Sequence, residues 1–194
     1  ALPGAAAWRI DPTILAGIVE VDETYIGGKE KAKHAGKKLR AGRGPVGKVA
    51  VMGMRERGAR GRTKAMPVRS TEASTLQAAI HGSVEAGSTL HTDEHGGYQG
   101  IGGLFYDHHT VSHRAGEYVR DGVTTNSIES VWAVMKRGLH GVYHHASEKH
   151  LHRYVDEFTF RLNDGDVKRH TMDRLDSLVA ASCGPRLTYE ALTA

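Results

Sequence analysis

The order of strand-like and helix-like patterns constrains the fold of this chain more than any other feature of its sequence. Segments rich in Val, Ile and Thr with a period of two residues come first, and a helical segment with one apolar face follows them. Further strands then precede the remaining helices, an order that predicts an α/β domain with one mixed sheet and helices packed on it. The expected strands are residues 18–26, 48–55, 64–69, 88–93 and 109–112. The first expected helix is capped by Ser70 or Thr71 and runs to about Val84, and the second is capped by a residue in 124–126. A third opens at Ser147, and a short fourth lies between Met172 and Ala181.

Acidic residues stand at unusual places in three of these segments. Asp22 lies in the middle of an otherwise largely apolar strand, where an unpaired buried carboxylate is costly and needs a partner. Asp93 ends the strand 88–93 just before a glycine turn, and Glu129 lies in the first turn of the helix near Asn126. If they converge, these carboxylates form an oxygen-only site suited to Mg²⁺ or Mn²⁺.

Each acid also has a structural interpretation. In this alternative, Asp22 pairs with an arginine, and Asp93 is a turn residue that bonds to its own backbone. Glu129 would be the third helical residue of a capping box, with Asn126 as the cap. The pattern alone leaves both interpretations open, because three carboxylates are easy to find in any sequence.

The basic residues are concentrated in one part of the chain. Residues 29–64 hold thirteen of the 26 Lys and Arg but only two acids, Glu30 and Glu56, which gives this segment a net charge of +11. Because the whole chain carries +4, the remainder carries −7. A basic segment beside carboxylate-bearing strands favours a polyanion such as nucleic acid as partner, and a solvated loop is the alternative.

Other features exclude several classes of protein. Cys183 is the only cysteine, so an internal disulfide and a zinc finger with paired cysteines are excluded. The longest apolar stretch, residues 14–21, is interrupted by Gly17 and Glu20 and is shorter than the ~20 residues that a membrane helix needs. No secretion signal opens the chain. We therefore expect a cytoplasmic protein with no membrane partner.

Several long segments resemble the ISXO-like group of insertion-sequence transposases, whose catalytic domains have an RNase H-like fold and an Asp-Asp-Glu metal site. The similarity covers residues 18–163 in collinear order. The segments that carry it are VDETYIGGK, KKLRAGRGPVGK, HTDEHGGY, TTNSIESVWAVMKRGLHGVYHH and HLHRYVDEFTFRLN. The resemblance implies that residues 17–163 form the RNase H-like catalytic domain, that 1–16 are a lead-in or remnant of an N-terminal region, and that 164–194 are a helical tail.

The resemblance also implies roles for particular residues. It assigns the metal-binding carboxylates to Asp22, Asp93 and Glu129, which would hold two Mg²⁺ or Mn²⁺ ions. Lys136 lies seven residues beyond Glu129, on nearly the same helix face and about 10 Å further along, where it would hold a DNA phosphate or be a solvated lysine. His113 either faces the metals and the scissile phosphate or is an ordinary exposed histidine. The expected nucleic-acid contacts are Lys37, Lys38, Arg40, Arg43, Lys48, Asn126, Lys136 and Arg137.

The activity implied by the resemblance is metal-dependent cleavage at transposon ends followed by strand transfer into target DNA. The expected partners are double-stranded DNA and further copies of the chain, as a dimer or higher assembly in the bacterial nucleoid. Two alternatives are a related nuclease that cuts without joining and a domesticated DNA-binding module that no longer catalyses.

Overall fold

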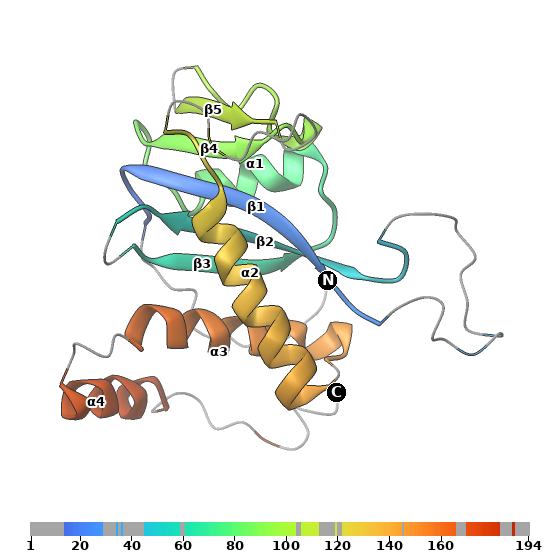
Figure 1. The fold of residues 1–194 in the computed structure, drawn as a ribbon, viewed down its shortest axis with the longest axis vertical. Helices are drawn as coiled ribbons and strands as arrows, with labels where there is room; N and C mark the ends of the chain where they lie inside the picture. Colours follow the sequence, from blue (N-terminus) through green and yellow to red (C-terminus); the bar gives the residue numbers. More distant parts are fainter. Residues whose placement is uncertain are drawn as a thin grey trace. The chain divides into compact units, whose positions relative to one another are not determined.

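The computed structural model describes residues 14–28, 34, 36, 45–58, 61–103, 106–112, 119, 122–144, 146–165, 170–182 and 188. Within them, three strands, a helix and two further strands precede the remaining helices, which is the order expected from the sequence (Figure 1). The elements are β1 (Ile18–Ile26), β2 (Val49–Glu56), β3 (Thr63–Val68), α1 (Ala73–His81), β4 (Thr89–Asp93), the 3₁₀ turn η3 (Gly96–Tyr98), β5 (Asp107–Val111), α2 (Asn126–Gly138), the π-helical turn η5 (Leu139–Tyr143), the 3₁₀ turn η6 (Glu148–His150), α3 (Leu151–Asp164) and α4 (Thr171–Ser182).

The strands form one five-stranded sheet in the order β3-β2-β1-β4-β5. β2 pairs antiparallel with both β1 and β3, whereas β4 pairs parallel with both β1 and β5. The antiparallel pairs need only short turns, and the parallel step from β3 back to β4 is made through α1, as parallel strands require. The expected α/β class with a single mixed sheet is confirmed.

An opening separates the central parallel strands β1 and β4 beyond their first residues. They pair only where Ile18, Val19 and Glu20 face the start of β4, and the last of these pairs joins Glu20 to His91. Continuing the same register by two residues brings Asp93 level with Asp22. Because ligands of α/β sheets bind in crevices beyond the carboxyl ends of parallel strands, this opening is a natural place for a site.

Two apolar cores lie on opposite faces of the sheet. On one face, apolar side chains of β1, such as Val21, and of β2, such as Met54, pack against Leu76 and Ile80 of α1. On the other face, α2 and α3 cover the sheet, with Ile128 among the buried residues. Figure 1 shows α2 crossing the front of the sheet and α1 behind it. Side chains of β1 therefore alternate between a face covered by α1 and a face covered by α2.

The start and end of α1 differ from the expectation. The helix begins at Ala73, with Glu72 at the N-cap, rather than at Ser70 or Thr71. It ends at His81 because Val84 forms a parallel bridge with Leu15, whose N–H donates to the Ser83 carbonyl at 2.8 Å. Strand-like pairing thus takes over the residues that the apolar periodicity assigned to the helix.

Contacts divide the chain into two compact units. The sheet and the helices α1 to α3 belong to Thr13–Asn163, apart from the last residue of α3, and α4 belongs to the other unit. The expected division into a lead-in (1–16), a catalytic domain (17–163) and a helical tail (164–194) stays a prediction. None of the helices in the described part of the chain is long and apolar enough to cross a membrane.

Candidate functional site

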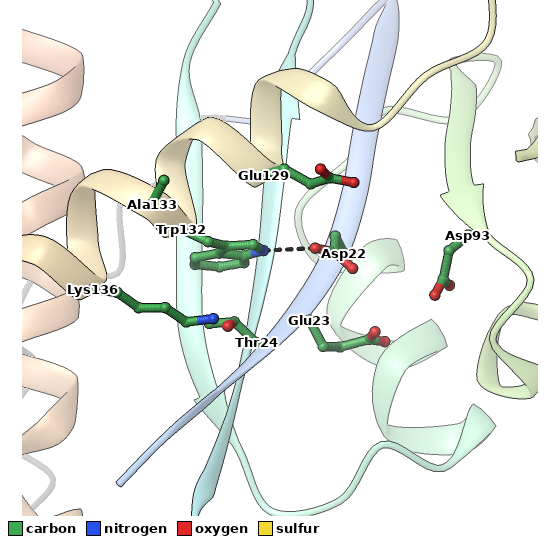
Figure 2. A pocket seen from close by; sticks show the side chains of 8 residues that line it. All are labelled: Asp22, Glu23, Thr24, Asp93, Glu129, Trp132, Ala133 and Lys136. Atoms are coloured by element: carbon green, nitrogen blue, oxygen red, sulfur yellow. Dashed lines mark hydrogen bonds between the residues drawn. The ribbon is translucent and has the colours of Figure 1, made fainter. Parts of the chain in front are cut away.

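A pocket of about 530 Å³ opens where β1 and β4 separate and α2 passes over them. Four of the residues singled out in the sequence line it: Asp22 from β1, Asp93 from β4, and Glu129 and Lys136 from α2. Figure 2 shows the three carboxylates and the ammonium group of Lys136 around this pocket. The full lining is Asp22, Glu23, Thr24, Asp93, Glu129, Trp132, Ala133 and Lys136.

Asp22 is held by an indole rather than by an arginine. The Nε1–H of Trp132 donates to its Oδ2 at 2.9 Å (Figure 2). The indole lies against β2 at Gly53, the residue that faces Asp22 across the strands, and a Cβ at this position would be only 2.3 Å from the Trp132 ring. Glycine is thus required there, because the ring occupies the space of a side chain. The contact of Gly53, Trp132 and Asp22 fixes the carboxylate against α2.

Asp93 takes the turn conformation that its structural interpretation predicted, and it also lies at the pocket. Its Oδ1 accepts a hydrogen bond from the backbone N–H of His95 at 2.9 Å, which closes an Asx turn after β4. The side chain is half-buried and lines the same pocket as Asp22. The two interpretations of this residue are therefore compatible.

Glu129 is oriented by Thr125 rather than by Asn126. Thr125 is the N-cap of α2, and its hydroxyl donates to the Glu129 carboxylate at 3.2 Å. Asn126 is exposed, and its backbone N–H donates to the Thr124 hydroxyl at 3.1 Å. The expected capping box with Asn126 as cap is wrong, because α2 starts so that Asn126 is already its first helical residue.

A buried carboxylate that sequence reasoning did not single out ties α2 to β1. Glu20 is 1% exposed, and its Oε2 accepts from the Ser127 N–H at 2.8 Å, the Ser127 hydroxyl at 2.5 Å and the Ile128 N–H at 3.2 Å. Its Oε1 accepts from Arg57 Nε at 3.0 Å. Glu20 therefore satisfies the N–H groups that open α2 and joins the strand of Asp22 to the helix of Glu129.

Two carboxyl groups of the pocket have raised pKa values. Burial, and to a smaller extent the charges of Asp93 and Glu129, raises the pKa of Asp22 from 3.8 to about 6. Burial and the charges of Asp22 and Asp93 raise the pKa of the neighbouring Glu23 from 4.5 to about 7, against the lowering effect of the Tyr98 hydroxyl. Carboxyl groups with raised pKa values are common in catalytic and ion-binding sites.

The carboxylates do not already form a closed set of metal ligands. Among the described residues, no three His, Cys, Asp or Glu side chains are gathered tightly enough to hold an ion together. Their oxygen atoms are nevertheless the donors that Mg²⁺ and Mn²⁺ prefer. The lining residues thus fit a hard divalent cation by chemistry and position, while their side chains stand apart.

The expected basic contacts are placed only in part. Lys136 reaches along the pocket toward Thr24 (Figure 2), and Arg137 on α2 and Lys48 before β2 are exposed. Roles in DNA binding for these residues and for Asn126 stay predictions. His113 and the basic residues Lys37, Lys38, Arg40 and Arg43 lie outside the described residues.

Comparison with known families gives a match over most of the chain. Residues 14–163 match the ISXO2-like transposase domain. No curated protein matches the sequence significantly. The matched residues contain the whole five-stranded sheet, the helices α1 to α3 apart from Asp164, and every residue that lines the pocket. The expected RNase H-like fold and the expected resemblance are therefore both confirmed. This chain belongs to the family of ISXO2-like transposases.

Proposed function

We propose that this transposase is a metal-dependent nucleotidyltransferase that cleaves DNA at transposon ends and joins the ends to target DNA. One observation carries the proposal. Asp22, Asp93 and Glu129 lie far apart in the sequence and on three different elements, yet they line one pocket together with Lys136. Carboxylates beside a basic residue are what phosphodiester chemistry with divalent cations requires.

The proposed cofactor is Mg²⁺ or Mn²⁺, as two ions held by Asp22, Asp93 and Glu129. Burial and the charges of Asp93 and Glu129 raise the pKa of Asp22, and a bound cation would give this carboxyl group a counter-charge. When bound, a pair of such ions stabilises the attacking and the leaving oxygen of a phosphodiester.

The residues of the chain supply position and charge. Trp132 fixes Asp22 through its hydrogen bond, and the Glu20 cap fixes the first turn of α2, from which Glu129 projects. Lys136 lies on the same side of α2 as Glu129 and at the same pocket, where its ammonium group would bind a phosphate of the DNA backbone. Water attacks a phosphodiester at the transposon end and the bond from phosphorus to the 3′-oxygen breaks, which leaves a 3′-OH and a 5′-phosphate. The 3′-OH then attacks a phosphodiester of the target, and the 3′-oxygen of the target strand leaves as a new 3′-OH.

DNA is the substrate that membership in a transposase family implies. We propose that the chain acts on double-stranded transposon ends and target DNA as a homodimer or higher assembly. Arg137 and Lys48, both exposed, are the described basic residues that we expect beside Lys136 in contact with the phosphate backbone.

The experiment is an end-cleavage and strand-transfer assay on DNA that carries the element's inverted repeats, in Mg²⁺ or Mn²⁺. Asp93→Asn should reduce both reactions by about 10²-fold or more, the cost typical of removing an electrostatic group from an active site. Asp107→Asn is the matched control, because Asp107 is exposed at the opposite end of the parallel strands.

The outcomes of this assay distinguish the transposase from the two alternative functions. Wild-type activity in Asp93→Asn would refute the role of Asp93. Cleavage without joining by the wild type would identify a nuclease, and DNA binding without cleavage in either metal would identify a non-catalytic module.

A further inference from the structure

Glu23 enters the proposed metal pocket from the face of the sheet opposite Glu129. Along β1 it shares its face with Val19 and Val21, which pack in the core covered by α1. Asp22 and Glu129 belong to the face covered by α2. A strand residue on the α1 face reaches the same pocket only because β1 and β4 no longer pair beyond Glu20. Figure 2 shows the Glu23 side chain extending toward Asp93, below Asp22.

The Glu23 carboxylate is buried, and one of its oxygens has no hydrogen-bond donor among the described residues. Its side chain is 6% exposed, and the oxygen without a donor is Oε1. The nearest basic atom is Nδ1 of His95 at 4.0 Å, but this nitrogen accepts a hydrogen bond from the Gly97 N–H at 3.1 Å. An imidazole nitrogen that accepts carries no proton, so this atom of His95 offers Glu23 no donor.

Tyr98 interacts with this carboxylate, and its interaction is weak. Its buried hydroxyl lies beside Glu23 and lowers the pKa of that carboxyl group, but among the described residues it makes no hydrogen bond of normal geometry. A buried carboxylate with so little compensation is costly. Here it is retained at a pocket that already contains Asp22 and Asp93.

We propose that Glu23 is a fourth carboxylate of the metal site and binds a divalent cation together with Asp22 and Asp93, from the side of the sheet opposite Glu129. This inference rests on the proposed function. The cation between β1 and β4 would then have a ligand from each face of the sheet. Glu129 would bind it from the face covered by α2, and Glu23 from the face covered by α1.

The test is a calorimetric titration of the full chain with MnCl₂. It measures Mn²⁺ affinity directly, without DNA and without an activity assay. Glu23→Gln should weaken Mn²⁺ binding about tenfold or more, since loss of even an outer-shell partner of a metal costs 10–100-fold. Tyr98→Phe and the exposed control Glu85→Gln should leave the affinity unchanged. Asp22→Asn serves as the positive control for the site.

A second measurement separates metal binding from a structural role. In EDTA, Glu23→Gln should be at least as resistant to thermal unfolding as the wild type, because it removes a poorly compensated buried charge. In MnCl₂, the variant should show a smaller rise of its Tm than the wild type does. A loss of stability in EDTA would mean that Glu23 supports the fold, and it would overturn the proposal.

The controls distinguish failure of this inference from failure of the proposed function. If the wild type bound no Mn²⁺, or if Asp22→Asn bound it as tightly as the wild type, the proposed metal site itself would be wrong. If those two behaved as expected but Glu23→Gln bound Mn²⁺ like the wild type, only the role of Glu23 would be refuted. Weakening of equal size in Tyr98→Phe would show that Glu23 acts through Tyr98, and would also refute it.

Discussion

Replacing Glu20 with glutamine removes the charge that joins β1 to α2 while keeping the size of the side chain. The carboxylate accepts from the Ser127 N–H and hydroxyl, from the Ile128 N–H and from Arg57. The glutamine amide has one oxygen and a donor group, so it cannot accept from both Arg57 and the start of α2 in the present geometry. At least one of the two connections is therefore lost.

The expected cost follows from these contacts. Glu20 accepts from N–H groups at the start of α2, in addition to the N-cap Thr125. Loss of such a capping acceptor costs about 1 kcal/mol, and loss of the charge near the partly buried helix terminus adds up to about 2 kcal/mol. A hydrogen bond to a charged group contributes about 1.5–3 kcal/mol, but Arg57 is 31% exposed and regains water in the variant, so we take the lower end. Because these terms overlap, we expect Glu20→Gln to lower the free energy of unfolding by about 2–4 kcal/mol.

Urea unfolding of the full chain, in EDTA, measures this change directly. Glu85→Gln is the control, because Glu85 is exposed and its replacement should change stability by no more than about 0.5 kcal/mol. Ser127→Ala should reproduce part of the loss, and adding it to Glu20→Gln should have a smaller effect than it has alone. A free energy of unfolding for Glu20→Gln equal to that of Glu85→Gln would refute the reasoning.

Three further changes test the packing and the electrostatics of the domain. Gly53→Ala should lower stability by about 1–3 kcal/mol in urea unfolding, because its Cβ would clash with Trp132, whereas Gly141→Ala meets no atom within 4 Å and should be neutral. In EDTA, the stability of the wild type relative to Asp22→Asn should fall as the pH rises from about 4 to about 6. Folding favours the protonated form of Asp22, so the stability that this group contributes is fully present below its unfolded pKa of 3.8 and is lost as the pH rises through its folded pKa of about 6. A stability difference between the two proteins that did not change with pH would contradict this. Asn163→Ala should lower stability by about 1–3 kcal/mol, since its amide pairs with the backbone at the start of β3 through hydrogen bonds of 2.8 and 2.9 Å; an unchanged urea midpoint would exclude it.

The spacing of apolar residues was sufficient to predict the strands of the sheet and most of the helices, because apolar side chains recur regularly on one face of a strand or helix. It failed at Val84, where pairing with Leu15 overrides a helical apolar pattern. It also failed at the start of α2, because Thr124, Thr125 and Asn126 are all acceptable caps and only tertiary contacts decide among them. Such choices depend on partners that are distant in the sequence.

The residues of the site divide in a similar way. The period of two residues along β1 places Glu20 and Asp22 on one face, but nothing in the local sequence indicates that Glu20 meets the first turn of α2. The same alternation places Glu23 on the opposite face, apart from Asp22. Its presence in the pocket depends on where β1 and β4 stop pairing, which is a property of the register between strands and not of either strand alone.

The position of the Glu20 cap has a consequence for how the site is assembled. The charges of Asp93 and Glu129 raise the pKa of Asp22, so repulsion among these carboxylates opposes the packing of α2 on β1. The Glu20 carboxylate attaches α2 to β1 through Ser127, two residues before Glu129 and two residues after the N-cap, at a point outside the pocket. Trp132 attaches the next turn of α2 through Asp22 itself. The helix is thus fixed on either side of Glu129 by contacts that need no metal, so the pocket can keep mutually repelling carboxylates in place and ready for a cation.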